Sequence, residues 1–290
     1  MTRQPNPELI ERLSEVLGSS PSDFAHVTGG YTAAARWRFR LGDERLFVKC
    51  ATTPVTAEML QRELHAYDVL DLPMMPQFVG CSRDPVAPFL VIEDLSEGAW
   101  PPPWTPDKVD SVSETVEALH RAPPPPGLPS HLAVHGARGN GWETVAADPN
   151  PFLGLGVLTA ADLDACLPDL IALAAACQFD GDAICHWDLR SDNMCLTDRG
   201  VVLIDWTEAC IGAAAPDLGA WLPSLHQEGG PTPEHLLPDA PEVAAWVAGF
   251  FAARAGLPII PDAPRVRDVQ KSQLSTALPW ALRARAKAQG

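Results

Sequence analysis

The feature that most constrains this chain is an ordered set of polar residues in its second half. The segment HWDLRSDN (residues 186–193) is followed by the apolar run VVLI (201–204) and then by Asp205. The apolar run predicts a strand that pairs with residues 194–196 through a turn at 197–200. Polar side chains at the open end of such a hairpin are expected to converge, which makes this segment the candidate site.

The residue types in this segment are those that phosphoryl transfer requires. That reaction needs a carboxylate to accept the proton of the attacking hydroxyl and hard oxygen ligands for Mg²⁺. Asp188 fits the first role, and Asn193 and Asp205 fit the second. Arg190 could reach the transferring phosphoryl group. The alternative is that His186, Asp188 and Asn193 only satisfy turn backbone, but their order before an apolar strand favours the catalytic interpretation.

Composition excludes several classes of protein. The 290 residues carry a formal net charge of −16, which would repel a nucleic acid backbone and an anionic membrane surface. No apolar run is long enough to cross a bilayer, and the N-terminus lacks the apolar core of a signal peptide, so a cytoplasmic protein is expected. The seven cysteines form no C-x-x-C pair and are expected to be buried, reduced thiols.

The acidic residues are unevenly distributed along the chain. Residues 107–262 contain 22 Asp and Glu against 6 Lys and Arg, whereas the remainder contains 15 of each. This excess is either a solvated surface that keeps the protein soluble or part of a cleft that attracts a cationic small molecule. A cleft of this kind would favour an amine-bearing ligand.

Periodicity and proline clusters predict two lobes of different character. Prolines at 101–103 and 123–126 mark boundaries, because proline blocks the continuation of a helix. Before the first cluster, the pattern predicts a β-hairpin at 34–50, a helix at 56–70 that starts without a capping box, and a strand at 89–92. The first lobe is expected to end near residue 95, where a proline-rich connector begins.

The second lobe is expected to be mainly helical. Apolar spacing predicts helices at 107–121, 159–178 (bent or interrupted at Pro168), 217–225, 241–255 and 270–288. Residues 122–158, rich in Pro, Gly and Asn, are expected to form a long loop or insertion. The predicted fold is therefore α+β and bilobal, with a small β-rich N-terminal lobe at residues 1–95 and a larger, mainly α-helical C-terminal lobe at 96–290.

At residues 186–205 the chain resembles the aminoglycoside phosphotransferase family, a branch of the protein-kinase-like fold that includes choline kinases. Lys49 in the sequence FVK is similar to the strand lysine that binds the α- and β-phosphates, and Glu63 to its helix partner. Lys49 could otherwise be an edge-strand lysine, and Glu58 competes for the role of Glu63. An uncharacterised branch of the family shares a Gly-Gly-Pro sequence, here at 229–231.

The resemblance implies further site residues. It implies a nucleotide-covering turn without the usual glycine spacing and a connector whose backbone binds the nucleotide base. It also implies supporting roles for residues around the loop. Two carboxylates flank the site and could hold a substrate ammonium group or simply be solvated. The turn consists of Gly29, Gly30, Tyr31 and Thr32, and the connector of Glu93, Asp94 and Leu95. The supporting residues are His120, His186 and Asp217, and the flanking carboxylates are Asp192 and Glu208.

The activity implied by the resemblance is Mg²⁺-dependent transfer of the γ-phosphoryl group of ATP, or GTP, to a hydroxyl of a small metabolite or antibiotic, as in antibiotic resistance. Amine-bearing and neutral acceptors both remain open, and specificity is expected to come from residues 122–158 and the C-terminal helices. The alternatives are a catalytically silent nucleotide-binding regulatory module on the same fold and an inert acidic interaction protein.

Overall fold

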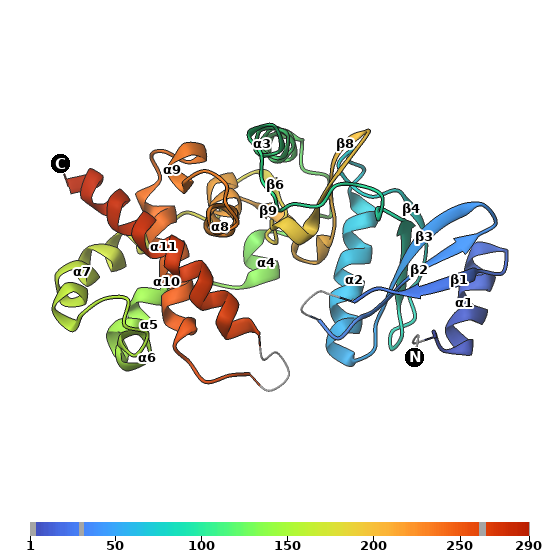
Figure 1. The fold of residues 1–290 in the computed structure, drawn as a ribbon, viewed down its shortest axis with the longest axis horizontal. Coiled ribbons are helices and arrows are strands. Elements are labelled where there is room, and N and C mark those ends of the chain that lie inside the picture. Colours follow the sequence, from blue (N-terminus) through green and yellow to red (C-terminus); the bar gives the residue numbers. More distant parts are fainter. Residues whose placement is uncertain (1–3, 29–31, 261–264, 290) are drawn as a thin grey trace. The chain divides into compact units, whose positions relative to one another are not determined.

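The chain folds into two compact units in a computed structural model that describes residues 4–28, 32–260 and 265–289. Figure 1 shows the elements of each unit. The first unit contains Met1–Pro101, Pro125–Leu128 and Asp192–Ala209; the second contains Pro102–Pro124, Pro129–Ser191 and Cys210–Gly290. The hairpin that carries Asp205 thus packs with the N-terminal residues, although it is far from them in sequence.

The first unit is built on a five-stranded antiparallel sheet. The strand order is β1-β2-β3-β5-β4, and the predicted hairpin at 34–50 forms β2 and β3. The predicted strand at 89–92 is β5, which pairs with β3. The strands are β1 Ser22–His26, β2 Ala35–Leu41, β3 Glu44–Cys50, β4 Phe78–Ser82 and β5 Phe89–Glu93.

Alternation of side chains along the strands gives this sheet two apolar faces. Helix α1 (Pro7–Leu17) packs Leu13 against one face, with Val48 and Val91. Helix α2 (Pro54–Val69) covers the other face, against which Leu60 and Leu64 pack. Figure 1 shows this helix beside the sheet. Since Lys49 follows Val48 directly in β3, its side chain points to the face that α2 covers.

Helix α2 begins earlier than predicted, and it does have a capping box. The hydroxyl of Thr53 accepts the backbone N–H of Thr56, and the hydroxyl of Thr56 accepts the backbone N–H of Thr53. Pro54 occupies the first turn, where its missing N–H is not needed. The expectation of a start without a capping box was wrong, because the reciprocal partner is Thr rather than the usual Glu or Gln.

The predicted hairpin around Asp205 is confirmed. Strand β7 (Met194–Thr197) pairs antiparallel with β8 (Gly200–Leu203), with Met194 opposite Leu203. A 3₁₀ turn η1 (Ser191–Asn193) precedes the hairpin and another, η2 (Trp206–Glu208), follows it. The backbone N–H of Ile204 also donates to the carbonyl of Asn193 at 2.9 Å, which closes the open end.

The second unit is mainly helical, and its longer helices were predicted. Helix α7 continues through Pro168 without interruption. Helices α10 and α11 pack together, and α10 also packs on α5 and α7. The helices are α3 Pro106–Arg121, α4 His131–His135, α5 Gly141–Ala147, α6 Asn150–Leu153, α7 Ala160–Ala176, α8 Ala214–Gln227, α9 Pro233–Leu236, α10 Pro241–Ala255 and α11 Val266–Gln289.

Residues 122–158 correct the expectation of a long loop, because they contain α4, α5 and α6. Trp142 in α5 and Phe152 in α6 are fully buried and their rings meet edge to face. These short helices therefore owe their stability to tertiary packing rather than to length. A short antiparallel pair, β6 (Ala183–Cys185) and β9 (Cys210–Gly212), completes the unit.

All seven cysteines are free, as expected; six of them are buried, whereas Cys81 is only half-buried. Burial raises the pKa of the Cys50 thiol to about 12, so this cysteine stays protonated and unreactive at neutral pH. Among the residues that the structure describes, no helix combines the length and apolar character needed to span a membrane.

Candidate active site

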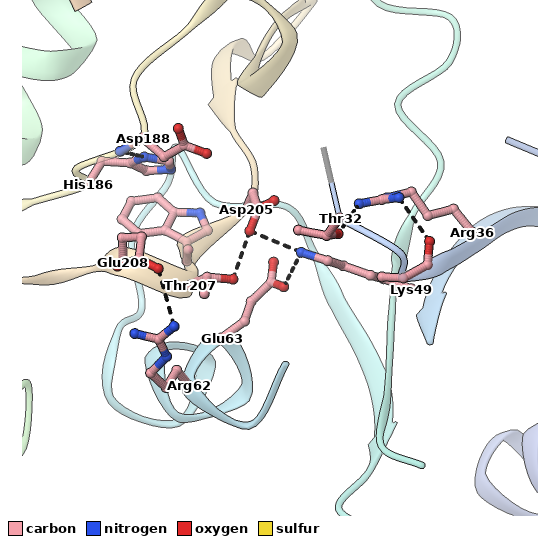
Figure 2. Close-up of polar contacts among 12 residues, drawn as sticks. Thr32, Arg36, Lys49, Arg62, Glu63, His186, Asp188, Asp205, Thr207 and Glu208 are labelled. Carbon is pink, nitrogen blue, oxygen red and sulfur yellow. Dashed lines mark hydrogen bonds and ion pairs between the residues drawn. The ribbon is translucent and has the colours of Figure 1, made fainter. Parts of the chain in front are cut away.

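Lys49, Glu63 and Asp205 form an ion cluster within the first unit (Figure 2). Lys49 lies in strand β3 and Glu63 in helix α2. Asp205 lies two positions after the end of strand β8. The Lys49 Nζ donates to Glu63 Oε2 at 2.7 Å and to Asp205 Oδ1 at 3.0 Å. The sequence places these residues up to 156 positions apart, and the fold brings them within one set of hydrogen bonds.

Burial makes this cluster strongly coupled. Burial by itself would lower the pKa of Lys49, but the charges of Glu63 and Asp205 outweigh it and the pKa is raised, so Lys49 is a cation. Burial raises the pKa of Glu63, and the charge of Lys49 opposes that shift. The cluster therefore stays intact only while its single ammonium group faces the two carboxyl groups.

Asp205 is held in an unusual backbone conformation. Its φ is 64°, in the left-handed region that few residues other than glycine adopt. The hydroxyl of Thr207 donates to Asp205 Oδ1 at 2.8 Å and thereby fixes the carboxylate from the C-terminal side. On the N-terminal side, the closed end of the hairpin places Asn193, which is buried, next to the strand that leads to Asp205. The first unit thus pairs the backbone of Asn193 with that of Ile204, the residue before Asp205.

Helix α2 is bound to the turn η2 by a second ion pair. Arg62 Nη2 lies 3.3 Å from Glu208 Oε1, as Figure 2 shows. The backbone N–H of Trp206 also donates to the Glu63 carboxylate. Glu208, predicted as a candidate for a substrate ammonium group, therefore has an arginine partner here, whereas the side chain of Asp192 is exposed.

The two carboxylates of the predicted base-binding connector, residues 93–95, and its Leu95 carbonyl already have partners within the first unit. The Glu93 carboxylate pairs with Arg199 and accepts the backbone N–H of Gln77. The Asp94 carboxylate accepts both the N–H and the hydroxyl of Ser96. The Leu95 carbonyl accepts the backbone N–H of Gly98 at 3.1 Å.

In the predicted nucleotide-covering turn, the hydroxyl of Thr32 accepts a bond from Arg36 Nη2 at 2.9 Å. The other three residues assigned to this turn, Gly29, Gly30 and Tyr31, lie outside the described residues.

In the second unit, Asp217 holds the start of the loop at 186–191. Asp217 lies in the first turn of α8 and is fully buried. Its Oδ2 accepts the backbone N–H of His186 at 3.0 Å and a bond from His120 Nε2 at 2.8 Å, while its Oδ1 accepts the backbone N–H of Trp187 at 2.7 Å. Trp187 has a φ of 58°, so this bracing stabilises a strained turn immediately before Asp188.

Asp188 and Arg190 lie on the same loop and face each other. Arg190 Nη1 is 3.8 Å from Asp188 Oδ1, and both side chains are about one third exposed. The backbone N–H of Asp188 donates to Nδ1 of the buried His186 at 3.3 Å (Figure 2). A carboxylate that reaches solvent from a braced loop is able to accept a proton from a bound hydroxyl.

Two groups of side chains could in principle hold a metal ion. Asn193 and Asp205 supply hard oxygen atoms, the donors that Mg²⁺ prefers. Elsewhere in the described part of the chain, ligand atoms of His120, Cys185 and Asp217 lie within 4.8 Å of one another. In that second group the carboxylate of Asp217 already accepts several hydrogen bonds, so its role is to brace the loop.

Comparison with known proteins decides the family. Residues 24–268 match the family model described as "Phosphotransferase enzyme family". The chain belongs to this family. The chain is therefore a phosphotransferase, as the sequence predicted. A search of the curated proteins finds no match to it.

Solved structures show the same fold at low sequence identity. Spectinomycin phosphotransferase APH(9)-Ia, in complex with ADP and spectinomycin, is 12% identical with a TM-score of 0.62, over 97% of the phosphotransferase and 99% of that chain. A thermostable mutant of aminoglycoside phosphotransferase APH(4)-Ia, with AMP-PNP and hygromycin B, is 15% identical with a TM-score of 0.58, over 98% and 100%. Choline kinase LicA from Streptococcus pneumoniae is 16% identical with a TM-score of 0.56, over 97% and 98%. The predicted α+β, protein-kinase-like fold is thus confirmed.

Sequence reasoning missed the residues that hold the site in place. Thr207 and Arg62 carry no motif, and their contacts depend on how η2 packs against α2. The same is true of Glu228, which bonds Ser191 of the 186–191 loop. Its only sequence signal is its position immediately before the Gly-Gly-Pro segment at 229–231.

Proposed function

We propose that the phosphotransferase transfers the γ-phosphoryl group of ATP, or GTP, to a hydroxyl of a small molecule in a Mg²⁺-dependent reaction. The observation that carries the proposal is the cluster of Lys49, Glu63 and Asp205, because it presents an oriented ammonium group beside a carboxylate within one compact unit. An ammonium group fixed in this way can bind phosphate oxygens without reorganisation.

Each residue then has a defined task. Lys49, oriented by Glu63, binds nucleotide phosphates. Asn193 and Asp205 are the residues that would hold Mg²⁺, which when bound neutralises charge on the phosphates. Asp188 orients the acceptor hydroxyl and takes its proton, while Arg190 stabilises charge on the transferring group.

The bound nucleotide and acceptor have proposed contacts of their own. Thr32 contributes to the nucleotide-covering turn, and the backbone of residues 93–95 contacts the base. Similar structures contain ADP or AMP-PNP, which supports nucleotide use, and acceptors as different as spectinomycin and hygromycin B. An amine-bearing acceptor, with Asp192 or Glu208 near its ammonium group, is the first class to test.

The test is a screen for ADP and GDP formation over amine-bearing and neutral alcohols, with and without Mg²⁺. Asp188→Asn should lower the rate by about 10²-fold or more while nucleotide still binds. Asp198→Asn is the matched control, because it makes the same change on the exposed turn of the β7–β8 hairpin.

Asp205→Ala should abolish turnover with the fold intact. Asp205→Asn covers the case in which Ala does not tolerate the left-handed backbone, because Asn adopts it more readily. Full activity in either Asp205 variant would contradict the assignment. Thermal stabilisation by nucleotide without turnover of any alcohol would instead favour a silent nucleotide-binding module.

A further inference from the structure

The Gly-Gly-Pro segment forms a tight turn that ends α8 and fixes the residue before it, Glu228. The backbone N–H of Gly229 donates to the carbonyl of His226, and that of Gly230 to the carbonyl of Leu225. Gly229 has a φ of 93°, and a Cβ on Gly230 would lie 2.8 Å from the Leu225 carbonyl oxygen. Only glycines allow this close return of the backbone.

The Glu228 carboxylate, so placed, accepts one hydrogen bond on each oxygen. The hydroxyl of Ser191 donates to Oε1 at 2.8 Å, and the indole N–H of Trp104 donates to Oε2 at 2.9 Å. Ser191 is 8% exposed and Trp104 is 9% exposed, so both donors would be left buried without an acceptor if the carboxylate were removed. Trp104 is also packed against Trp221 of α8, with ring centroids 5.5 Å apart.

Glu228 and Asp217 hold opposite ends of one loop. Asp217, at the start of α8, binds the backbone of residues 186 and 187, and Glu228, immediately after α8, binds Ser191. Asp188 and Arg190 lie between these two attachment points. A single helix therefore clamps, at both ends, the segment that carries the two proposed catalytic side chains.

We propose that Glu228 is a positioning residue that keeps Asp188 and Arg190 in their reactive orientation by anchoring Ser191, and that the glycine turn exists to place it. This inference rests on the proposed function. Without the Ser191 anchor the segment that carries Asp188 and Arg190 would be held less firmly, and a small displacement of a catalytic group lowers the rate of the chemical step. Nucleotide affinity is expected to be unaffected, because the residues proposed to bind the nucleotide, Lys49, Thr32 and residues 93–95, belong to the other unit.

The kinetic test separates the two bonds of Glu228. Glu228→Ala and Ser191→Ala should each lower kcat by about tenfold, as expected for a lost hydrogen bond to a charged group, with KM for MgATP changed by less than about twofold. The double variant should be no slower than the worse single variant. Ser191→Thr, which restores a hydroxyl, should recover most of the rate. The phosphoryl acceptor in these assays is the alcohol found in the screen. If the screen finds none, the hydrolysis of ATP, with water as the acceptor, is measured instead.

Trp104→Phe is the matched control, because it removes the other donor to Glu228 and keeps an aromatic ring against Trp221. It should leave kcat nearly unchanged. If Trp104→Phe slowed the reaction as much as Glu228→Ala while Ser191→Ala had no effect, Glu228 would only hold Trp104 and the inference would be overturned.

Hydrogen exchange gives a readout that does not depend on turnover. In Glu228→Ala and Ser191→Ala, the backbone amides of residues 187–193 should exchange faster with solvent, whereas Trp104→Phe should leave them unchanged. Unchanged exchange in Glu228→Ala would overturn the anchoring of the loop. If the loop exchanges faster in this variant but the unsubstituted protein turns over no nucleotide, the proposed function fails and the anchoring remains.

Discussion

At the scale of single residues, Lys49 decides the stability of the site. Its ammonium group separates two carboxyl groups, one of which is almost fully buried. Lys49→Met should lower the free energy of unfolding by about 3 kcal/mol, because it leaves the buried Glu63 carboxyl group without its counter-charge. Urea denaturation measures the change. The double variant Lys49→Met/Glu63→Gln should recover part of the loss, and an unchanged stability in the single variant would show that the pair is not coupled.

His131 makes the stability depend on pH. It is buried in α4, stacks on Phe179 at 5.0 Å and accepts a bond from Arg138 Nε at 3.3 Å. Burial lowers its pKa, the charge of Arg138 lowers it further, and Asp180 opposes the shift. The unfolded chain therefore binds a proton below about pH 6.5, before the folded protein does, and the free energy of unfolding falls as pH falls.

The check on His131 is a comparison of urea denaturation at pH 7.5 and 5.5. The loss of stability at the lower pH should be smaller in His131→Phe, which keeps the ring stack and removes the titrating group, than in the unsubstituted protein. An equal loss in both would assign the pH dependence to other groups.

Residue types predicted the ion cluster better than they predicted its supports. Lys49 and Asp205 stood at recognisable positions relative to strands. The structure bonds Lys49 directly to Asp205, and its helix partner is Glu63 rather than the competing Glu58. In contrast, the pairing of Glu208 with Arg62 was not predictable, because a solvated carboxylate and a paired one look the same in a sequence. Side chains that act through others carry no motif of their own.

At the scale of elements, length decided what the sequence revealed. The long helices and the hairpins showed clear periodicity, whereas β6 and β9 have three residues each and are too short to show one. Helices α4, α5 and α6 were hidden among Pro, Gly and Asn, which usually indicate loops. Their formation depends on the surfaces that they cover, and those are known only once the fold is known.

The contact between α5 and α10 illustrates such a dependence and can be tested. Gly141 opens α5 against Gly249 of α10, and a Cβ on Gly141 would lie 2.0 Å from the Gly249 carbonyl oxygen. Gly141→Ala should therefore lower the free energy of unfolding by about 2 kcal/mol, through the overpacking that it forces. Gly139→Ala is the matched control, since a Cβ there meets nothing within 4 Å. Equal stability of the two variants would contradict this close approach.

At the scale of the whole molecule, the fold redistributes the charge. The sequence suggested that residues 107–262 carry the entire acidic excess, but the basic C-terminal helix packs in the same unit. The first unit contains 18 Asp and Glu against 10 Lys and Arg, and the second 19 against 11, so each carries a net charge of −8. The long-range field is therefore acidic around both units, and neither unit alone provides the attraction for a cation.

A shared acidic field predicts opposite salt effects on the two substrates. MgATP carries a net negative charge and is repelled by a protein of net charge −16, so screening by added KCl should lower its KM. An amine-bearing acceptor is attracted, so its KM should rise over the same range. Both effects should level off above about 0.1 M, where charges more than about 10 Å apart are screened. Initial rates with each substrate varied in turn measure both constants, and a neutral alcohol is the control whose KM should not change. If the KM values of MgATP and the amine moved in the same direction, local side chains rather than the overall charge would govern the encounter.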